Sequence, residues 1–431
     1  ACKELGIRTV AIYSEEDKNT LFRTKADEAY QIGKGKTPVG AYLGIDEIIA
    51  LAKAKGVDAI HPGYGFLAEN AEFAQACADE GIEFIGPTAD MMNALGDKIQ
   101  SKLVAHSVGV PTVPGVEKAI ETEAEALEFA NSCGYPVMLK AAAGGGGRGM
   151  RIVRTEEELL PQFRSARSEA AKAFGIDDIF IEKYLENPKH IEVQILGDKA
   201  GNIVHLFERD CSIQRRHQKV LEEAPCDVIS PGLRKAMGDT AVKAAKAVGY
   251  ENAGTIEFLL DKDKNFYFME MNTRIQVEHP VTEWVTGVDL IKEQIRIADG
   301  QKLGMKQKEV RISGHAIECR INAENPMKNF RPSPGTITDV HFPGGEGIRV
   351  DTAVYTGYQV PPCYDSMLAK LIVHGDSREE AIHKMKSALG EVIIKGVETN
   401  IDYQYSILNH PDFISGNIDV EFVTEAKGLL A

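Results

Sequence analysis

The sequence predicts a multi-domain fold in which a parallel α/β domain precedes an α+β domain and a sheet-rich domain. The chain has 431 residues, of which 43% are hydrophobic and 26% are charged, enough for more than one buried core. Up to about residue 95, short apolar segments alternate with helical patterns. Hairpins of alternating apolar residues follow, and near residue 310 short segments separated by Pro and Gly begin. We therefore expect domains at 1–95, 96–309 and 310–431.

The first domain should alternate buried strands with helices. The predicted strands lie at 8–13, 59–60 and 84–85, and the predicted helices at 45–55 and 68–80. The loop at 61–66 follows a predicted strand, where open α/β sheets bind ligands. Residues 1–5 have the pattern of a last helical turn, which Gly6 ends. A strand would precede such a helix, so we expect the first strand of this domain to be missing from the numbered chain.

The second and third domains differ in their strand patterns. Alternating apolar residues predict strands of the second domain at 179–184, 190–196, 203–208 and 255–271. Near Val310 the pattern changes to short strands interrupted by Pro and Gly, followed by a helix at 378–389. We expect an α+β second domain and a small, sheet-rich third domain.

The charge balance argues against several classes of function. The chain has 49 Lys and Arg against 64 Asp and Glu, and a net charge of −15 disfavours binding to nucleic acid or to an anionic membrane. No apolar run approaches the ~18 residues of a membrane span, and the start lacks a signal-peptide pattern. The seven cysteines are odd in number and widely spaced, which fits neither zinc ligation nor a disulfide framework. We expect a soluble, cytoplasmic protein with reduced thiols.

A predicted strand ending in Lys140 leads into a glycine-rich loop. Three alanines follow Lys140, then Gly144, Gly145, Gly146 and Gly147, and a second predicted strand begins at Met150. Backbone N–H groups of such a loop can close over phosphates while the lysine contacts them as a point charge. No Lys-Ser or Lys-Thr follows the glycines, so this is not a Walker loop. A flexible linker is the alternative, which the flanking strands disfavour.

The predicted hairpin at 255–272 carries three oxygen-bearing side chains. Alternation places Glu270 and Asn272 on one face, and Glu257 joins them only if the register sets it opposite Phe268, across a turn at 261–264. Such hard oxygen ligands suit Mg²⁺ or Mn²⁺ shared with nucleotide phosphates. A solvated strand face is the alternative, but the aromatic neighbours make this hairpin look half-buried.

Continuing that strand brings Arg274, Gln276 and Glu278 to alternate positions, before His279-Pro280 stops it. A guanidinium, an amide and a carboxylate on one face form a pocket for a small oxyanion, with a base to deprotonate it. The alternative is an Arg–Glu pair on the surface.

Other signals are weaker. The segment at 182–185 ends a predicted strand and can present its backbone to an adenine edge, as any strand end can. The basic run at 214–219 has no interleaved aromatic residues, which favours local binding of phosphate or bicarbonate over nucleic acid. His190 and His217 are by default packed, satisfied histidines.

Six motifs, taken together, closely resemble the biotin carboxylase family, the ATP-grasp component of biotin-dependent carboxylases such as acetyl-CoA or pyruvate carboxylase. They are HPGYGFLAEN, KAAAGGGGRGM, FIEKYLENPKHIEVQ, RDCSIQRRHQK, FMEMNTRIQVEHPVTE and GHAIECRINAE. The resemblance covers essentially the whole chain and implies an N-terminal biotin carboxylase domain, an ATP-grasp domain with a glycine-rich lid at about 112–186, and a C-terminal biotin carboxylase domain.

The resemblance implies a role for each matching position. ATP would contact Lys98, Lys140, Gly144, Gly145, Gly146, Gly147, Glu182, Lys183, Leu185, His190, Gln214, His217, Glu257 and Glu270. Mg²⁺ or Mn²⁺ would bind to Glu257, Glu270 and Asn272. Bicarbonate would lie among Lys219, Arg274, Gln276, Val277 and Glu278, and biotin would face Tyr64 and Arg320. The implied catalytic residues are Lys219, Arg274, Glu278 and Arg320.

The implied reaction is ATP-dependent carboxylation of biotin by bicarbonate through carboxyphosphate, giving carboxybiotin, ADP and phosphate. The chain has no attachment site of the Ala-Met-Lys-Met type, so biotin should arrive on a carrier protein, beside a carboxyltransferase subunit or domain. The resemblance also implies a homodimer. One departure is Cys363, where the family has Tyr.

Two other classes of function remain open at this stage. One is an ATP-grasp ligase that joins a carboxylate to an amine, which would not need the RIQVEH segment or Arg320. The other is an inactive nucleotide-binding module.

Overall fold

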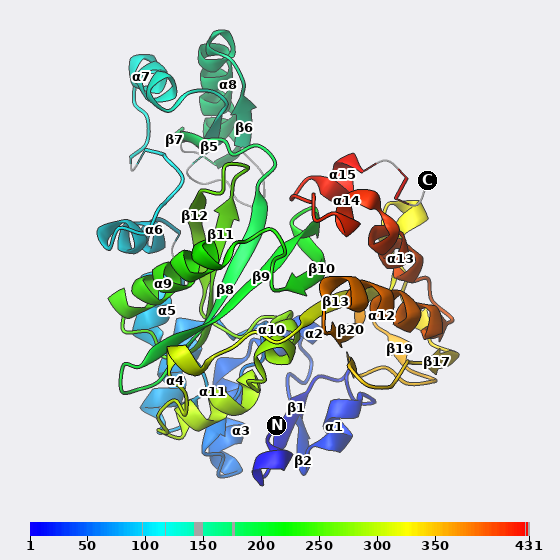
Figure 1. Ribbon diagram of the computed structural model, residues 1–431. Coiled ribbons are helices and arrows are strands. Elements are labelled where there is room, and N and C mark those ends of the chain that lie inside the picture. Colours follow the sequence, from blue (N-terminus) through cyan, green and yellow to red (C-terminus); the bar gives the residue numbers. More distant parts are fainter. Residues whose placement is uncertain (97, 117, 142–149, 175–176, 427, 430–431) are drawn as a thin grey trace. The chain divides into compact units, whose positions relative to one another are not determined.

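The computed structural model describes residues 1–96, 98–116, 118–141, 150–174, 177–426 and 428–429 (Figure 1). The chain divides into two compact units. The first consists of Ala1–Val110, Lys189–Leu259 and Glu270–Ala431, and the second of Pro111–Pro188 and Leu260–Met269. Each unit has a hydrophobic core of its own. The expected domain boundaries near residues 95 and 310 stay a prediction.

The first unit opens with short strands that pair in parallel. β1 (Val10–Tyr13) pairs with β2 (Glu28–Gln31), and β3 (Ala59–Ile60) pairs with β4 (Glu83–Phe84). The helices of this part are η1 (Lys3–Leu5), α1 (Leu21–Lys25), α2 (Pro38–Tyr42), α3 (Ile45–Ala54), α4 (Ala71–Asp79), α5 (Ala89–Gly96) and α6 (Lys98–Ser107). α3 and α4 bury Ile48, Ile49 and Phe73 in a common core. The prediction of a parallel α/β arrangement at the N-terminal end is confirmed.

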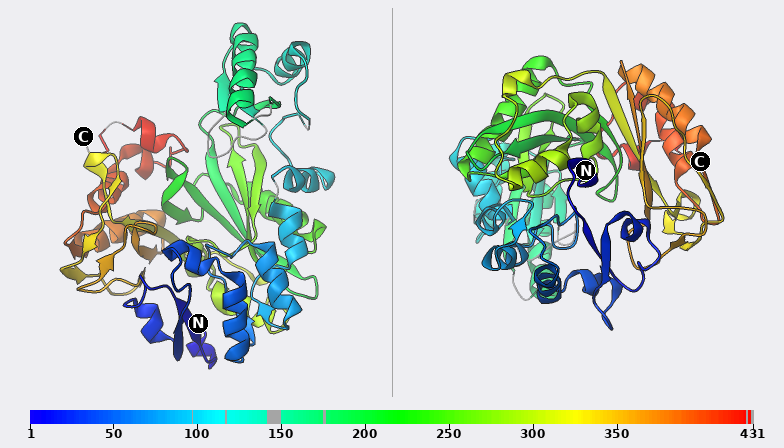
Figure 2. Two further views of the ribbon diagram at one scale, coloured as in Figure 1. Left: turned by 180° about the vertical axis from the view of Figure 1, so that it is seen from behind. Right: turned by 90° about the horizontal axis from the view of Figure 1, so that it is seen from below.

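An eight-stranded sheet positions most of the residues singled out above. Its strand order is β12-β11-β8-β9-β10-β13-β20-β18, and the pairs from β8 to β18 are antiparallel (Figures 1 and 2). The strands are β12 (Phe266–Asn272), β11 (Asn252–Leu260), β8 (Lys189–Gly197), β9 (Ile203–Arg215), β10 (Gln218–Ala224), β13 (His315–Asn322), β20 (Met367–Gly375) and β18 (Ile348–Thr352).

Three helices of the first unit accompany this sheet. They are α9 (Pro231–Ala247), α10 (His279–Thr286) and α11 (Leu290–Ala298). α9 packs against β8 and β9, whereas α10 packs against β9, β10 and β13. α10 is therefore held beside the middle of the sheet, and so is the end of the 273–278 segment that leads into it.

The basic run at 214–219 forms a hairpin turn, which the sequence did not predict. β9 continues to Arg215 instead of ending near residue 208, and β10 begins at Gln218. Arg216 and His217, at the turn, have positive φ angles of 50° and 64°. Two-residue turns of this kind usually carry Asn or Gly, which tolerate positive φ. Their absence hid the turn at the level of sequence.

The strand expected to continue to Glu278 ends at Asn272, so that prediction was wrong. β12 lies at the edge of the sheet, and the amide N–H of Thr273 donates to a side-chain oxygen of Glu69 (3.0 Å) instead of to a strand. Residues 273–278 form an irregular segment that leads into α10, with Glu278 at its N-cap and Pro280 in its first turn. Their alternate spacing therefore does not reflect a strand face.

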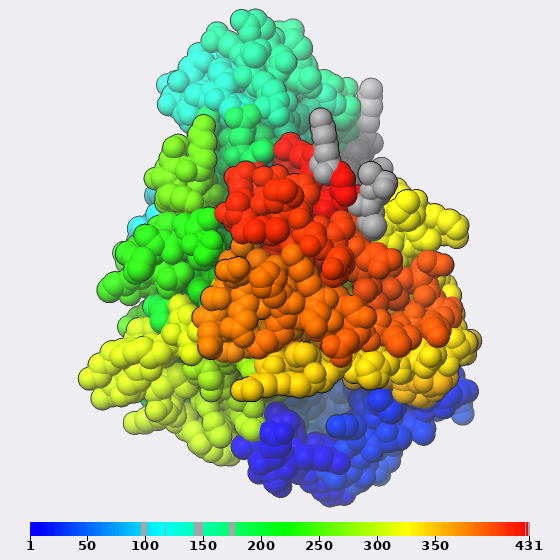
Figure 3. Space-filling view, turned by 45° about the vertical axis from the view of Figure 1, so that its right-hand side comes forward, coloured from blue at the N-terminus to red at the C-terminus, as the bar shows by residue number. Residues whose placement is uncertain are grey.

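The C-terminal part of the first unit packs helices on β13 and β20. Its core joins Leu371 and Val373 of β20 to Met385 and Ile407. The helices are η2 (Gln307–Glu309), η3 (Pro326–Lys328), α12 (Arg378–Glu391), α13 (Ile401–Asn409), α14 (Pro411–Ile414) and α15 (Phe422–Glu425). Figure 3 shows α12 to α15, in orange to red, gathered on one face. Three two-stranded pairs complete the part: β14 (Glu324–Asn325) with β15 (Arg331–Pro332), β16 (Gly335–Thr336) with β19 (Gln359–Val360), and β17 (Asp339–His341) with β21 (Ile393–Lys395).

The second unit is a three-stranded antiparallel sheet with two helices. The strand order is β6-β5-β7, and α7 and α8 pack on it around Leu139, Phe163 and Ile181. The elements are α7 (Glu123–Cys133), β5 (Val137–Ala141), β6 (Met150–Val153), α8 (Glu156–Phe174) and β7 (Ile179–Lys183). The strands expected on either side of the glycine-rich loop are present, while Gly144 to Gly147 lie outside the described residues.

Two further expectations can be compared with the described chain. No helix within the described ranges is long and apolar enough to cross a membrane. All seven cysteines are free thiols. Nothing in the structure explains Cys363 in place of Tyr.

Candidate active site

A cluster of buried and half-buried charged side chains, together with one amide, lies across the middle of the eight-stranded sheet. β8, β9, β10, β11 and β13 each contribute to it, and the 273–278 segment adds two more side chains. Its members are Glu192, Arg209, Lys219, Glu222, Glu257, Gln276, Glu278 and Arg320. Burying so many charges is costly unless each finds a partner. The hydrogen bonds below satisfy that requirement for nearly all of them.

Lys219 lies among three carboxylates. Its Nζ donates to Oε2 of Glu192 (2.6 Å), to Oε1 of Glu278 (2.5 Å) and, at 3.3 Å, to Oε1 of Glu257. Burial opposes the charge on the ammonium group, but these carboxylates together hold the pKa of Lys219 well above its usual value. Lys219 is therefore a fixed positive charge.

Glu278 is clamped between two cations. Lys219 contacts Oε1, and Nη2 of Arg320 donates to Oε2 (2.9 Å). The carboxylate is only 2% exposed, and burial alone would raise its pKa. The neighbouring charges of Lys219, Arg320 and Arg209 outweigh burial and hold the pKa of Glu278 well below its usual range. Glu278 is therefore ionised.

Arg320 is anchored from its other side by Glu222. Its Nε donates to Oε1 of Glu222 (2.6 Å), and Glu222 is fully buried in the neighbouring strand β10. Burial raises the pKa of Glu222 to about 7, although the charge of Arg320 opposes this. The Arg320 guanidinium thus contacts Glu222 through Nε and Nη2, and Glu278 through Nη2.

Glu257 and Asn272 share a face of the β11–β12 hairpin. Nδ2 of Asn272 donates to Oε1 of Glu257 (2.8 Å). β11 ends at Leu260, β12 begins at Phe266, and the Asp261 amide donates to the Asn265 carbonyl (2.9 Å). Asn265 therefore belongs to the turn, and the expected turn at 261–264 was wrong. Glu270 precedes Asn272 by two positions in β12, on the same face of the strand.

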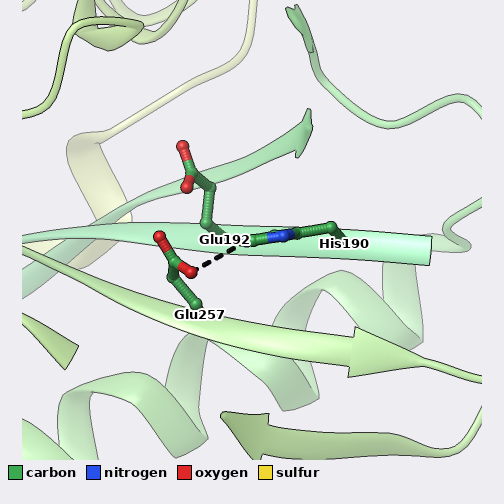
Figure 4. A group of neighbouring side chains, drawn as sticks. All are labelled: His190, Glu192 and Glu257. Carbon is green, nitrogen blue, oxygen red and sulfur yellow. Dashed lines mark ion pairs between the residues drawn. The ribbon is translucent and has the colours of Figure 1, made fainter. Parts of the chain in front are cut away.

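These three side chains fit the chemistry of a Mg²⁺ or Mn²⁺ site. They offer two carboxylates and one amide carbonyl, all hard oxygen donors. Burial opposes ionisation of Glu257, yet Lys219 and His190 hold its pKa well below the usual range, so it is a carboxylate. A second donor group, His190, Glu192 and Glu257, has its ligand atoms within 4.8 Å of one another (Figure 4).

That second group is already occupied by protein contacts. Nε2 of His190 lies 3.0 Å from Oε2 of Glu257, the pair joined by the dashed line in Figure 4, while Nδ1 of His190 lies 2.7 Å from Nε2 of Gln214. Both oxygens of Glu192 accept hydrogen bonds, one from Arg209 and one from Lys219. His190 and Gln214, two of the expected nucleotide residues, are thus in mutual contact.

Other predicted anion-binding residues lie on the segment before α10. Nε2 of Gln276 donates to Oε1 of Glu257 (3.0 Å). Arg274 donates to Oε2 of Glu69 (2.9 Å) and to Oδ1 of Asn272 (3.1 Å). The carbonyl oxygen of Val277 accepts from Nζ of Lys370 (2.7 Å). The structure therefore brings Gln276 and Glu278 to Lys219, whereas Arg274 pairs with Glu69.

The remaining predicted residues are more dispersed. Tyr64 is 41% exposed in the loop after β3. In the second unit, Lys140 forms an ion pair with Glu182, Lys183 donates to the carbonyls of Gly134 and Tyr135, and Leu185 is half-buried. His217 is exposed in the β9–β10 turn. Lys98 begins α6, and its side chain lies outside the described residues.

Several site residues were missed by sequence reasoning. Arg209, Glu192, Glu222, Glu69 and Lys370 all contact predicted site residues. A usable signal existed for Glu192, a charged residue between Ile191 and Val193 that must find a buried partner, whereas Arg209 is flanked by Glu208 and Asp210 and gave no such signal. Nothing local indicated which partner that would be.

Comparison with known proteins gives a consistent result. Three family models match the chain: "Biotin carboxylase, N-terminal domain" at 1–92, "Carbamoyl-phosphate synthase L chain, ATP binding domain" at 97–306, and "Biotin carboxylase C-terminal domain" at 318–425.

Two curated relatives match over nearly the whole chain. A pyruvate carboxylase subunit of Methanothermobacter thermautotrophicus is 55% identical over 99% of this chain and 87% of its own length. Biotin carboxylase 1 of Bacillus subtilis is 55% identical over 98% of this chain and 94% of its own length.

A solved structure also matches. It is the biotin carboxylase domain dimer of Hydrogenobacter thermophilus 2-oxoglutarate carboxylase, in complex with MgADP, ADP and bicarbonate. It is 53% identical, covers 98% of this chain and 93% of that chain, and superposes with a TM-score of 0.89.

The fold, the buried cluster and these matches define an ATP-grasp ligase. Within that class, the chain belongs to the biotin carboxylase family. The resemblance on which the predictions rested, and the predicted fold class, are confirmed.

Proposed function

We propose that this chain carboxylates biotin on a carrier protein, using bicarbonate and ATP, with the Lys219–Glu278–Arg320 group as the reaction centre. The observation that carries the proposal is the buried carboxylate of Glu278 held between two cations, with the amide of Gln276 nearby. A small anion needs fixed positive charge and hydrogen-bond donors, and a proton-bearing anion needs a base as well. This group supplies all three.

Bicarbonate binding changes the strength of the base. With Lys219 and Arg320 both on its oxygens, Glu278 is ionised but weakly basic. A bound anion that pairs with Lys219 or Arg320 in place of Glu278 removes a contact that lowers the pKa of Glu278. The carboxylate of Glu278 then becomes a better proton acceptor, and the bicarbonate proton that it removes lies next to it. Substrate binding and activation of the base are thereby coupled.

The chemistry follows from that proton transfer. Glu278 takes the proton of bicarbonate, and a bicarbonate oxygen attacks the γ-phosphorus of ATP while the bond to the β-phosphate oxygen breaks. The products are ADP and carboxyphosphate. Lys219 stays beside the new anion and stabilises the charge that develops. Glu257, Glu270 and Asn272 would hold Mg²⁺ or Mn²⁺, which would offset the negative charge of the phosphates.

Biotin is carboxylated in the second half of the reaction. The carbon–oxygen bond of carboxyphosphate breaks to give CO₂ and phosphate, and phosphate accepts the proton from N1′ of biotin. Arg320 stabilises the negative charge that forms on the ureido oxygen, and N1′ attacks CO₂. Glu222 supports this role because it holds the guanidinium in place when Glu278 has exchanged its partners.

Nucleotide contacts complete the proposal. Lys98, Lys140 and the glycines at 144–147 are assigned to the phosphates, and Glu182, Lys183 and Leu185 to adenine, with His190, Gln214 and His217 as further contacts. Tyr64 is assigned to biotin, and its exposure supports contact with a substrate that arrives from solution.

Partners follow from the relatives. The relatives include a pyruvate carboxylase subunit, so a biotin carrier protein and a carboxyltransferase subunit or domain complete the reaction. A homodimer is proposed because the matching domain of 2-oxoglutarate carboxylase is described as a dimer.

The test is ATP turnover with and without bicarbonate, and then with free biotin. We expect ADP release to require bicarbonate and Mg²⁺ and to rise when biotin is added. Equal hydrolysis in bicarbonate-depleted buffer would contradict the proposal. Turnover that instead depends on an amine and a carboxylate would support the alternative ATP-grasp ligase.

A further inference from the structure

Arg209 is the most completely engaged side chain of the buried cluster. It lies in β9, its side chain is 0% exposed, and its guanidinium makes five hydrogen bonds. Nε donates to Oε1 of Glu192 (2.6 Å), Nη1 to Gln194 (2.8 Å) and Thr282 (2.9 Å), and Nη2 to Thr255 (3.2 Å) and Gln276 (2.7 Å). A guanidinium has five N–H groups, so its donors are fully used.

The acceptors of Arg209 come from four separate parts of the fold. Glu192 and Gln194 lie on β8, Thr255 on β11, Gln276 on the 273–278 segment and Thr282 on α10. Only Glu192 carries a formal charge. Neutralising one carboxylate does not require four additional neutral acceptors. The planar fork of Arg209 therefore fixes the geometry of these elements as well as compensating a charge.

One consequence concerns the amide of Gln276. A guanidinium can only donate hydrogen bonds, so it must face the amide oxygen of Gln276 and not the NH₂ group. Nη2 of Arg209 contacts Oε1 of Gln276 (2.7 Å), and Nε2 of Gln276 consequently points to Oε1 of Glu257 (3.0 Å). The NH₂ group is thus presented on the side of Lys219 and Glu257. This is the orientation that an anion requires.

A second consequence concerns Lys219. Glu192 is fully buried and divides its two oxygens between Arg209 and Lys219. Because Arg209 holds Oε1, the other oxygen is fixed in direction and holds the ammonium group of Lys219 (2.6 Å). Arg209 thus determines the positions of two groups that come from different elements, one directly and one through Glu192.

We propose that Arg209 is the positioning residue of the bicarbonate site: it orients the Gln276 amide and, through Glu192, the Lys219 ammonium group, without touching the substrate. This inference rests on the proposed function. It implies that replacing the Arg209 guanidinium weakens binding of bicarbonate more than binding of ATP.

The test replaces Arg209 with Lys, which keeps the charge but offers three N–H donors in place of five. We expect the KM for bicarbonate to rise by about 10–100-fold, the usual range for losing hydrogen bonds to charged and anion-binding groups. The KM for ATP should change by less than about threefold. The matched control is Arg378→Lys, a buried arginine whose guanidinium contacts Glu223 and two backbone carbonyls outside the site. It should leave both KM values unchanged.

A double-mutant cycle separates positioning from general stabilisation. If Arg209 acts on bicarbonate partly through Gln276, then Arg209→Lys should cost less in a Gln276→Ala background than in the wild type. Additive effects, or a bicarbonate KM equal to that of the control, would overturn the inference. Should Arg209→Lys not fold, Thr282→Val removes one acceptor of the fork without a change of charge and should raise the bicarbonate KM by about 3–10-fold. A Thr282→Val enzyme with the wild-type bicarbonate KM would then contradict the inference.

The two proposals fail in different ways. Wild-type ATP cleavage that is independent of bicarbonate would overturn the proposed function and this inference together. Bicarbonate-dependent wild-type cleavage, with Arg209→Lys behaving like Arg378→Lys, would overturn only the role of Arg209.

Discussion

Glu278 shows how single residues divide the work of this site. Its two oxygens contact two different cations, Lys219 on one side and Arg320 on the other. In the proposed reaction Glu278 and Lys219 act on bicarbonate, whereas Arg320 acts on biotin. Substitutions at Glu278 and Arg320 should therefore affect different steps.

Replacing Glu278 with Gln keeps the size and most hydrogen bonding but removes the proton acceptor. We expect bicarbonate-dependent ATP cleavage to fall by about 10²–10⁴-fold, the usual contribution of general-base catalysis, while nucleotide affinity persists. Glu283→Gln, which affects a half-buried carboxylate paired with Arg349 outside the site, is the matched control. Near-full turnover of Glu278→Gln would exclude it as the base.

Replacing Arg320 with Ala should act later in the reaction. Carboxybiotin formation should decrease more than bicarbonate-dependent ATP cleavage, because the proposed role of Arg320 begins after carboxyphosphate has formed. Both products are measured in the same assay. Equal losses of ATP cleavage and carboxylation would contradict the separation of roles.

At this scale the sequence predicted the polar residues proposed to contact substrate better than the residues that hold them in place. Gln276, Glu278 and Lys219 were identified because their residue types and motifs point to anion chemistry, and the structure brings them together. Arg209 contacts residues 15 to 73 positions away along the chain. No local pattern encodes such pairings, so its role required the fold.

At the scale of elements, one buried ion-pair group on β10 holds the C-terminal helix α12 and β13 together. Glu223 accepts from Nε of Arg378 (2.7 Å), at the start of α12, and its Oε2 lies 2.8 Å from Nε2 of His315 on β13. Although burial opposes ionisation, His315 and Arg378 lower the pKa of Glu223 to about 2. A group whose pKa is lower in the folded state stabilises the fold above its unfolded pKa, and this contribution is lost as pH falls toward the folded value.

This predicts a specific pH dependence of stability. The difference between an ordinary pKa of 4.5 and a folded value of about 2 corresponds to about 3 kcal/mol of stabilisation at pH 7. Glu223→Gln should lower the free energy of unfolding by about that amount at pH 7, and the deficit should shrink as pH falls below 4.5 toward 2. Denaturant titrations of both proteins at several pH values measure this, with the exposed Glu391→Gln as control. A deficit independent of pH would contradict it.

Element boundaries were predicted where apolar patterns are long and missed where turn chemistry is unusual. The helix expected at 378–389 is α12, and the parallel pairs of the N-terminal part agree with the alternating pattern. The β9–β10 turn uses Arg216 and His217 at positive φ, which residue type did not indicate. The 273–278 segment looks like a strand in sequence, but β12 ends at Asn272, and the side chains of Gln276 and Glu278 contact residues of the central strands instead.

At the scale of the whole molecule, one chain carries the ATP-dependent half of a carboxylase reaction. The residues proposed for bicarbonate chemistry lie in the first unit, while Lys140, Glu182, Lys183 and Leu185 lie in the second. The fold class and the family were predicted from motifs spread over the entire length, because six separate segments agreed.

The most direct test of the central claim follows one oxygen atom. If bicarbonate attacks the γ-phosphate of ATP, the attacking oxygen stays with phosphorus when carboxyphosphate breaks down. Turnover with ¹⁸O-labelled bicarbonate, ATP, Mg²⁺ and biotin should therefore give inorganic phosphate that carries one ¹⁸O atom for each ADP formed, as measured by mass spectrometry. Phosphate without label, its new oxygen coming from water, would contradict carboxyphosphate as the intermediate and the role proposed for Glu278.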